Sequence, residues 1–272
     1  VKVAREGLVG DVAIAAQAGA TAPAPLAGAL VQTFAETLAC LAVVNLIRPG
    51  TPMNFGMWPF ISDLRTGAFS GGSGEEALVI AATTQIINHY GLIGSVPTGM
   101  TDSKCMDAQA GYEKAITTLA AVLAGGNMVC AYPGIVGSLL AQSFEGMAID
   151  NDMMGMALRV LRGIEVTDET LAVEGIEQAV FGEGHFLNQQ QTLDLMQTEY
   201  LYPEVGDRRT VNEWEAEGGE TILERAHERV EAILGSHYPE YIDPDTDEAI
   251  RDRFPIKLTR EEMTPGNARW KA

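Results

Sequence analysis

The segment around Trp58 concentrates aromatic side chains in a chain that has few of them. Phe55, Trp58 and Phe60 fall within six residues, although aromatic residues make up only 7% of the sequence. The faces of such rings attract a quaternary ammonium group through the ring quadrupole, with about 0.5–2 kcal/mol per ring. Tyr132, further along the chain, is a candidate to close the same cage. The alternative is that these rings only pack against one another.

A second candidate segment, residues 98–104, reads Thr-Gly-Met-Thr-Asp-Ser-Lys. Asp102, Lys104 and Arg65 are the charged groups expected beside the same site. A ligand carboxylate would bind a bidentate Arg, a Lys, or the N-terminus of the helix predicted to begin near residue 106. The alternative for Asp102 is that it caps this helix, and Lys104 and Arg65 are equally consistent with surface charges. Met100 would form a polarizable wall of the pocket or a plain part of the core.

Other polar groups are weaker candidates. Helical spacing places Glu145 and Asp152 on one face of a predicted helix, but the sequence assigns them no acid–base role. His185 lies in a Gly-rich segment and is a candidate substrate-binding residue, although a lone His is more often structural. The glycines of residues 71–74 lack the Lys and the spacing of a phosphate-binding loop. The three cysteines and four histidines lack metal-ligand spacing, so no metal site is predicted.

Four short apolar segments predict the elements that position these residues. Each is followed by Gly or Pro and then by a longer segment with helical periodicity, which is typical of parallel βα units. In α/β barrels, active sites lie at the C-terminal ends of the strands and in the loops that follow, where the candidates above fall. The predicted strands are residues 11–16, 52–56, 93–97 and 127–131, and the helices after the first three are residues 26–48, 75–90 and 107–124.

Beyond Ile135 we expect helices and no further strands. The predicted helices are residues 137–161, 168–179 with Thr167 as N-cap, 189–200 and 211–235, followed by an extended, Pro-rich tail. We therefore expect two domains: residues 1–164, which form half of a (β/α) barrel, and residues 165–272, which form an acidic helical extension. The acidic extension is either a solvated surface or a docking face for a basic partner.

Composition and charge narrow the class of protein. The 272 residues carry a formal net charge of -19, which argues against nucleic acid and anionic membranes as partners. We expect no membrane span, because the longest apolar run, residues 37–47, is too short and contains Asn45. An odd number of cysteines with apolar neighbours is typical of a reducing, cytoplasmic environment.

Several blocks of this sequence resemble the trimethylamine methyltransferase family. They are residues 98–104, the Gly125-Gly126-Asn127 turn, residues 18–32, the acidic-Asn-acidic stretch at residues 150–152, and the Gly-rich segment with His at residues 181–187. The resemblance covers about residues 12–256. It implies an α/β fold of the (β/α)8 TIM-barrel type, of which this chain would be about four C-terminal βα units with a helical tail. Family members are roughly twice this length.

The resemblance also implies a reaction, the transfer of a methyl group from an amine to the Co(I) of a corrinoid protein. The founding members have pyrrolysine where this chain has Met100, and its imine is thought to activate a tertiary amine by forming an adduct. Methionine has no electrophilic carbon, so we expect a substrate that is already quaternary, such as glycine betaine. The alternatives are trimethylamine as substrate, or a truncated fragment that binds without turnover.

The implied partners follow from this chemistry. The corrinoid (cobalamin) belongs to a cognate partner protein, so we expect no cofactor bound directly by this chain. We also expect assembly as a homo-oligomer. In this interpretation Met100 and Asp102 are the catalytic candidates, and the substrate-binding candidates are Phe55, Trp58, Phe60, Tyr132, Arg65, Lys104 and His185.

Overall fold

A computed structural model describes residues 1–237 and 241–263 of the chain. The chain divides into two compact units, residues 1–206 and residues 207–272. The first unit contains every strand of the described residues. It opens with the short helix α1 (Lys2–Glu6) and is the unit in which the candidate residues near the sheet are found.

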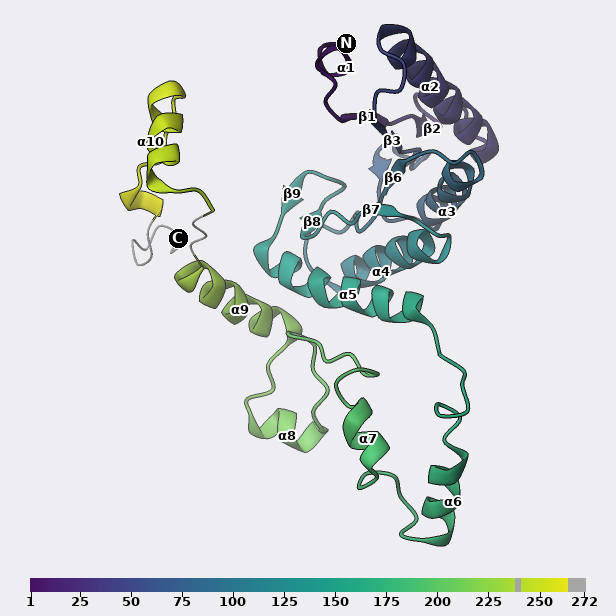
Figure 1. The fold of residues 1–272 in the computed structure, drawn as a ribbon, viewed down its shortest axis with the longest axis vertical. Coiled ribbons are helices and arrows are strands. Elements are labelled where there is room, and N and C mark those ends of the chain that lie inside the picture. The colour runs from purple at the N-terminus through teal and green to yellow at the C-terminus, as the bar shows by residue number, and fades with distance from the viewer. Residues whose placement is uncertain (238–240, 264–272) are drawn as a thin grey trace. The chain divides into compact units, whose positions relative to one another are not determined.

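The four predicted strands form one parallel sheet, as expected. Its order is β1-β3-β6-β7, so each strand lies beside the next predicted strand in the sequence (Figure 1). Because all four run in the same direction, their C-terminal ends meet at one edge of the sheet. The strands are β1 (Gly10–Ile14), β3 (Met53–Met57), β6 (Gly94–Pro97) and β7 (Met128–Cys130).

A helix follows each of the first three units and packs beside the sheet (Figure 1). Ser73 and Asp107 cap the second and third of these helices, and each accepts the backbone N–H of the residue three positions later. The helices are α2 (Leu26–Ile47), α3 (Gly74–His89) and α4 (Ala108–Leu123), within two residues of the predicted bounds.

Two small sheets border the strand ends and were not predicted. The strand β2 (Gln17–Ala18) pairs in parallel with β4 (Phe60–Ser62), which pairs antiparallel with β5 (Phe69–Ser70). Strands of two or three residues are too short to show an alternating pattern in the sequence.

The expectation that strands end before residue 135 is wrong. β8 (Ile135–Val136) and β9 (Ala141–Gln142) form an antiparallel hairpin, and the helix predicted over residues 137–161 begins only at Phe144, as α5 (Phe144–Arg162). Gly137, Ser138 and Leu139 have positive φ values of 59°, 55° and 74°, which an α-helix cannot contain. The N–H groups of Gly137 and Ser138 bind the carbonyls of residues 103 and 101, so tertiary hydrogen bonds hold this turn.

The parallel sheet has two different faces, because side chains alternate along each strand. Met57 and Val96 lie on one face, in a core cluster with Ile80 and Ile87 of α3. We call the opposite face the polar face, and Asp11, Ala13 and Met128 on it are exposed. By the strand register, the polar face consists of Asp11, Ala13, Asn54, Gly56, Ser95, Pro97, Met128 and Cys130.

The first unit continues past α5 to residue 206, so the compact division falls 42 residues beyond the predicted boundary at 164. Asp152 on α5 explains this, because its carboxylate accepts the N–H groups of Glu204, Val205 and Gly206. Arg159 reinforces the connection by donating to the Glu199 carbonyl. Between α5 and residue 199 the chain forms α6 (Val173–Phe181) and α7 (Gln190–Leu195). Both are shorter than the predicted helices 168–179 and 189–200.

The second unit contains short helices. The single helix predicted over residues 211–235 is two, α8 (Val211–Ala216) and α9 (Ile222–Ser236), because Gly218 and Gly219 between them have φ values of 103° and 67°. The extended tail is also wrong where it is described, since α10 (Pro244–Arg253) and the 3-10 turn η1 (Glu261–Met263) lie there. Pro244 occupies the first turn of α10, where its missing N–H costs no hydrogen bond. Pro239 and Pro265 lie outside the described residues.

Helix α2 exposes large apolar side chains in this structure. Ala29, Thr33 and Thr37 are its buried residues, whereas Val31 is 70% and Leu46 86% exposed. By length and composition α2 could cross a membrane, so the prediction that no segment reaches this length is wrong. The predicted apolar run began at residue 37 because polar side chains precede it. The helix contains those polar residues and extends over 22 residues.

Gly99 tests the turn that follows β6. Its φ is +69°, and an added Cβ would lie 2.0 Å from the Ala131 carbonyl oxygen. We expect Gly99→Ala to lower the free energy of unfolding by about 1–3 kcal/mol. Gly111→Ala on α4 is the matched control, since a Cβ there meets no atom within 4 Å, and it should stabilise by about 0.5–1 kcal/mol. Chemical denaturation measures both, and equal effects would contradict the assignment.

Candidate functional site

A ladder of hydrogen bonds crosses three strands on the polar face. The Asn54 Nδ2 donates to Asp11 Oδ1 at 2.8 Å and to Ser95 Oγ at 3.1 Å. The indole Nε1 of Trp58 donates to the Ser95 carbonyl at 3.1 Å. The ladder therefore connects β1, β3 and β6 and fixes the orientation of Trp58 just beyond the end of β3. The sequence signal for it was Asn54, a polar residue inside the apolar strand Met53–Met57.

Trp58 and Tyr132 meet at the C-terminal ends of β3 and β7. Their ring centroids are 6.0 Å apart and the ring planes are nearly perpendicular, at 87°. Gly56 lies under the indole, because an added Cβ there would be 3.0 Å from Trp58 Nε1. Tyr132 has a φ of 32°, a left-handed conformation that is uncommon for a bulky residue. Burial raises the pKa of Tyr132, with smaller contributions from Cys130 and Asp11. Both phenol and indole are only partly exposed.

The structure does not bring Phe55 and Phe60 to this pair. Phe55 lies within β3 on the helix-facing side, opposite to Asn54 and Gly56, and is 4% exposed. Phe60 lies in β4 and makes an edge contact with Phe69, at 4.8 Å between centroids. The predicted single cage is therefore two groups of rings, because the parity of a strand position decides which face its side chain reaches.

Met100 lies in the loop after β6 and is fully buried. Its neighbour is Gly71, where an added Cβ would come within 2.8 Å of Met100 Cβ and 3.4 Å of a Phe69 ring carbon. Gly71 is thus small because Met100 packs on it, which accounts for part of the glycine stretch of residues 71–74. Met100 is therefore covered by protein in this structure.

Asp102 organises the loops at this edge of the sheet. Its carboxylate accepts the Ser70 hydroxyl at 2.5 Å, the Gly71 N–H at 2.8 Å and the Ser138 hydroxyl at 2.7 Å. It is not the cap of the following helix, since Asp107 fills that position. Three donors from two other loops make Asp102 a positioning group whose oxygens are already occupied.

Two consecutive residues of α4 support the same loops from below. Glu113 accepts the Thr101 hydroxyl at 2.6 Å and the Asp102 N–H at 2.8 Å. Lys114 donates to the Gly99 carbonyl at 2.6 Å and to Asp150 Oδ2 at 2.8 Å. Their signal in the sequence was their place in the buried stripe of α4, at helical spacing from Ala110, Thr117 and Ala121.

The Lys114–Asp150 pair is a buried ion pair, with side chains 1% and 2% exposed. Asp150 also accepts the Gly134 N–H at 2.7 Å, so the pair joins α4, α5 and the turn after Tyr132. Burial raises the pKa of Asp150, opposed by the hydrogen bond and charge of Lys114. Of the predicted acidic group, Asp150 is thus structural, Asp152 holds residues 204–206, and Glu145 accepts the Ser143 hydroxyl.

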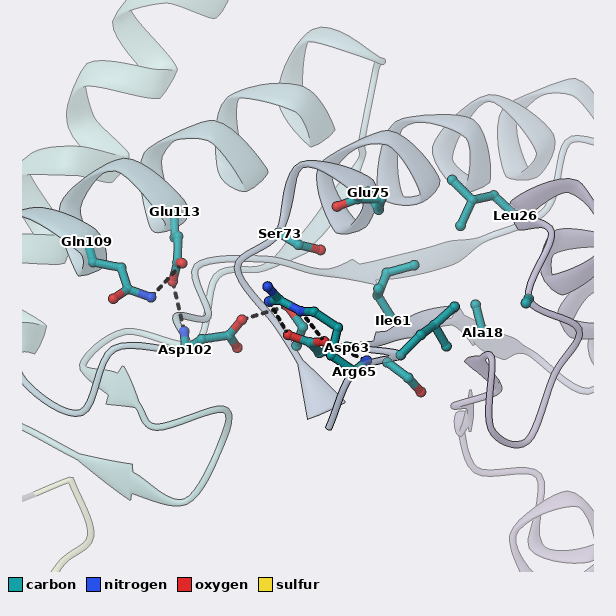
Figure 2. A pocket seen from close by; sticks show the side chains of 14 residues that line it. Ala18, Leu26, Ile61, Asp63, Arg65, Ser73, Glu75, Asp102, Gln109 and Glu113 are labelled. Carbon is teal, nitrogen blue, oxygen red and sulfur yellow. Dashed lines mark hydrogen bonds and ion pairs between the residues drawn. The ribbon is translucent and has the colours of Figure 1, made fainter. Parts of the chain in front are cut away.

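A cavity of about 770 Å³ lies beside these loops, at the N-termini of α2, α3 and α4 (Figure 2). Arg65 and Asp102 line it, whereas Trp58 and Tyr132 do not. Arg65 is paired with Asp63 at 2.6 Å, and this contact lowers the pKa of Asp63 to about 2. Charged and aromatic candidates therefore occupy separate places.

The last two predicted binding residues are also apart from the aromatic pair. Lys104 donates to the Asp102 carbonyl at 2.7 Å and is exposed. His185 lies in the turn after α6, with its Nε2 3.5 Å from Glu183. Among the described residues, neither Lys104 nor His185 has a hydrogen bond, ion pair or ring contact with Trp58 or Tyr132.

Glu76 is a buried acid that the sequence did not single out. It is fully buried in the first turn of α3, and neither carboxyl oxygen has a hydrogen-bond partner among the described residues. Burial raises its pKa well above the ordinary 4.5, and the Asp102 charge adds to the effect. Glu76 is therefore stored as a neutral acid, because an isolated buried carboxylate is too costly.

Comparison with known proteins places this arrangement in a family. The family model described as Trimethylamine methyltransferase (MTTB) matches residues 1–263. The chain is 38% identical over 234 residues to the glycine betaine methyltransferase of Desulfitobacterium hafniense (strain Y51), covering 86% of this chain and 48% of that protein. It is 36% identical over 245 residues to the trimethylamine methyltransferase MttB of Methanosarcina thermophila, covering 90% and 50%.

This chain belongs to the trimethylamine methyltransferase family, as the sequence blocks predicted. It spans about half the length of the curated relatives that it matches. Among those relatives are proteins named for glycine betaine and proteins named for trimethylamine. The family is therefore established by sequence.

Breaking the buried ion pair tests the support under the loops. Lys114→Met leaves the Asp150 carboxylate buried without a cation, so we expect the free energy of unfolding to fall by about 3–5 kcal/mol. The double variant Lys114→Met/Asp150→Leu should recover most of this loss, because it buries no charge. Lys104→Met, an exposed control, should stay within about 0.5 kcal/mol. Equal losses in the single and double variants, measured by urea denaturation, would contradict this account.

Glu76 predicts a pH dependence of stability. Its pKa is raised in the folded state, so the folded protein binds the proton more tightly than the unfolded chain does. The associated stability is complete below the unfolded value of about 4.5 and is lost as pH rises toward the raised folded value. Glu76→Gln removes this loss, so its stability relative to the wild type should increase with pH across that window. Thermal unfolding of Glu75→Gln, an exposed neighbour, should show no such trend.

Proposed function

We propose that the protein containing this chain transfers a methyl group from a quaternary amine of the glycine betaine type to the Co(I) of a cytoplasmic corrinoid protein. The observation that carries the proposal is the perpendicular Trp58–Tyr132 pair, 6.0 Å apart at the C-terminal ends of parallel strands. Two rings that present different faces to one point suit a compact, permanently charged ammonium group. Family membership supports methyl transfer as the reaction class.

The residues of this chain would bind and orient the donor. Trp58 is held by its indole hydrogen bond to Ser95, so its face is positioned before the ligand arrives. The corrinoid of the partner would supply the cobalt that accepts the methyl group, and the electron pair of the broken C–N bond would remain on the nitrogen held by this chain. At the moment of transfer the product amine is neutral, so its attraction to the rings is weaker than that of the donor until it takes up a proton from solvent. That loss of charge favours product release.

Met100 supports a quaternary rather than a tertiary donor. A tertiary amine is a poor leaving group unless it gains a fourth substituent, and methionine has no electrophilic carbon to supply one. In this structure Met100 is also fully buried against Gly71, as a packing residue would be. Its thioether therefore takes no covalent part in the proposal. Trimethylamine as donor is the competing hypothesis, because relatives with that name match equally long parts of the chain.

We further propose that these βα units form half of a (β/α)8 barrel. In a protein as long as the curated relatives, the other half of the sequence would complete the barrel. The sheet has strands β1 and β7 at its two edges, and bare edges are a liability that proteins avoid. The exposed apolar side of α2 has the character of a helix covered by neighbouring units. A truncated fragment that binds without turnover is the alternative.

The donor is tested with a Co(I) corrinoid protein and the protein carrying this chain. We expect glycine betaine or a related quaternary amine, and not trimethylamine, to methylate the corrinoid. The visible absorbance of the corrinoid measures this methylation. Comparable rates from trimethylamine would overturn the argument from Met100. Transfer from neither donor, with a partner shown to be competent, would favour the fragment that binds without turnover.

The aromatic site is tested by removing one ring. Trp58→Ala should weaken binding of a quaternary amine by about 1–2 kcal/mol, because one cation–π face is lost. Calorimetric titration measures the change. Tyr241→Ala removes an exposed ring in the other unit and should leave binding unchanged. Equal effects of the two substitutions would contradict the placement of the ammonium group at Trp58.

A further inference from the structure

The polar face carries a charge that the proposed function has not used. Asp11, in the edge strand β1, is exposed on this face. It is the only acidic or basic residue among the strand residues that the described sheet places on this face, since the others are Ala, Asn, Gly, Ser, Pro, Met and Cys. The polar face is therefore negative near its edge. None of its strand residues in the described sheet is basic, so none of them would compete with a cationic ligand for Asp11.

Asp11 belongs to the same ladder as Trp58. The Asn54 amide holds Asp11 Oδ1 at 2.8 Å and reaches Ser95, which in turn accepts the Trp58 indole N–H. The carboxylate is thus oriented by the group that also orients the aromatic ring. The Asn54 bond occupies one oxygen of the carboxylate. An exposed carboxylate with a fixed direction is suited to attract a cation that approaches this face.

We propose that Asp11 is the counter-charge of the ammonium site, and that it makes the site selective for a permanently cationic ligand over a neutral one of the same shape. This proposal rests on the ammonium site at Trp58 and Tyr132. Ring faces alone discriminate weakly, because they also bury neutral methyl groups favourably. A carboxylate adds attraction for the cation only.

The electrostatic reach of Asp11 is visible in its surroundings. Its negative charge contributes to raising the pKa of Cys130, after the larger effect of burial, and contributes in the same direction at Tyr132, which follows β7. At Tyr132 the Asp11 charge is the smallest of these causes, after burial and Cys130. A ligand cation beside Tyr132 would experience the same charge with the opposite, favourable sign.

A matched pair of ligands separates charge from shape. Choline carries a trimethylammonium group, and 3,3-dimethylbutan-1-ol is its neutral carbon counterpart. We would titrate each into the wild-type chain, Asp11→Asn, Asp11→Glu and Glu36→Gln by ligand-observed NMR. Glu36 is an exposed acid on α2, so its substitution matches the change in net charge. Unfolding temperatures of the four proteins report any loss of structure.

For Asp11→Asn we expect the dissociation constant of choline to rise about two- to fivefold, as for an exposed charge pair. The constant of the neutral alcohol should not change, and added salt should weaken choline binding less than in the wild type. Asp11→Glu should restore choline binding, and Glu36→Gln should resemble the wild type. Unchanged choline binding in Asp11→Asn, or equal weakening of both ligands, would overturn the proposal.

Trp58→Ala distinguishes this failure from failure of the proposed function. If Trp58→Ala weakens both ligands while Asp11→Asn affects neither, the aromatic site is correct and Asp11 is not its counter-charge. If Trp58→Ala leaves choline binding unchanged, or if the wild type binds neither ligand, the ammonium site itself is wrong. In that case the function proposed above and the role of Asp11 fail together.

Discussion

The buried pair of Lys114 and Asp150 is the interaction on which the ends of the strands depend. Lys114 holds the Gly99 carbonyl in the loop after β6, and Asp150 holds the Gly134 N–H in the turn after β7. A buried charge is tolerated only with a partner and further hydrogen bonds, and both are present here. The pair therefore fixes the two loops relative to each other, including Tyr132 in its uncommon backbone conformation.

The adjacent Glu113 extends this support to Asp102, and Asp102 extends it to the loops at Ser70 and Ser138. Asp102, which was a candidate for chemistry, and Asp150, which lies in the acidic stretch of the family, both position other residues in this structure. Their oxygens are engaged by several donors each, which leaves little capacity for a substrate. The proposed binding surface lies instead at Asp11 on the polar face and at Trp58 and Tyr132 beyond the strand ends, and all three residues are at least partly exposed.

The two faces of the sheet differ in chemical character. The helix-facing side buries Met57, Val96 and their partners on α3 in one apolar cluster. The polar face instead carries a ladder of hydrogen-bonded side chains and exposed residues. A polar inner face and an apolar outer face suit a sheet that curves around a ligand site. The exposed apolar side of α2 is consistent with further units beside this one.

The sequence by itself determined the family, the four parallel strands and the three helices that follow them. Those features depend on local periodicity, caps such as Asp107, and contiguous blocks of residues, all of which are legible along the chain. The hairpin β8–β9 was not legible, because its turn is held by hydrogen bonds to the distant residues 101 and 103. The late boundary at residue 206 has the same cause, since Asp152 binds backbone more than fifty residues away.

The candidate site residues were likewise predicted only in part from the sequence. Sequence reasoning found Trp58 and Tyr132 because aromatic residues after strands are visible in one dimension. Only the tertiary structure decided that Phe55 faces the helices, that Met100 is buried under Gly71, and that Asp11 shares a ladder with Trp58. The physical reason is that strand register and side-chain parity set which residues meet, and one residue of difference moves a side chain to the other face.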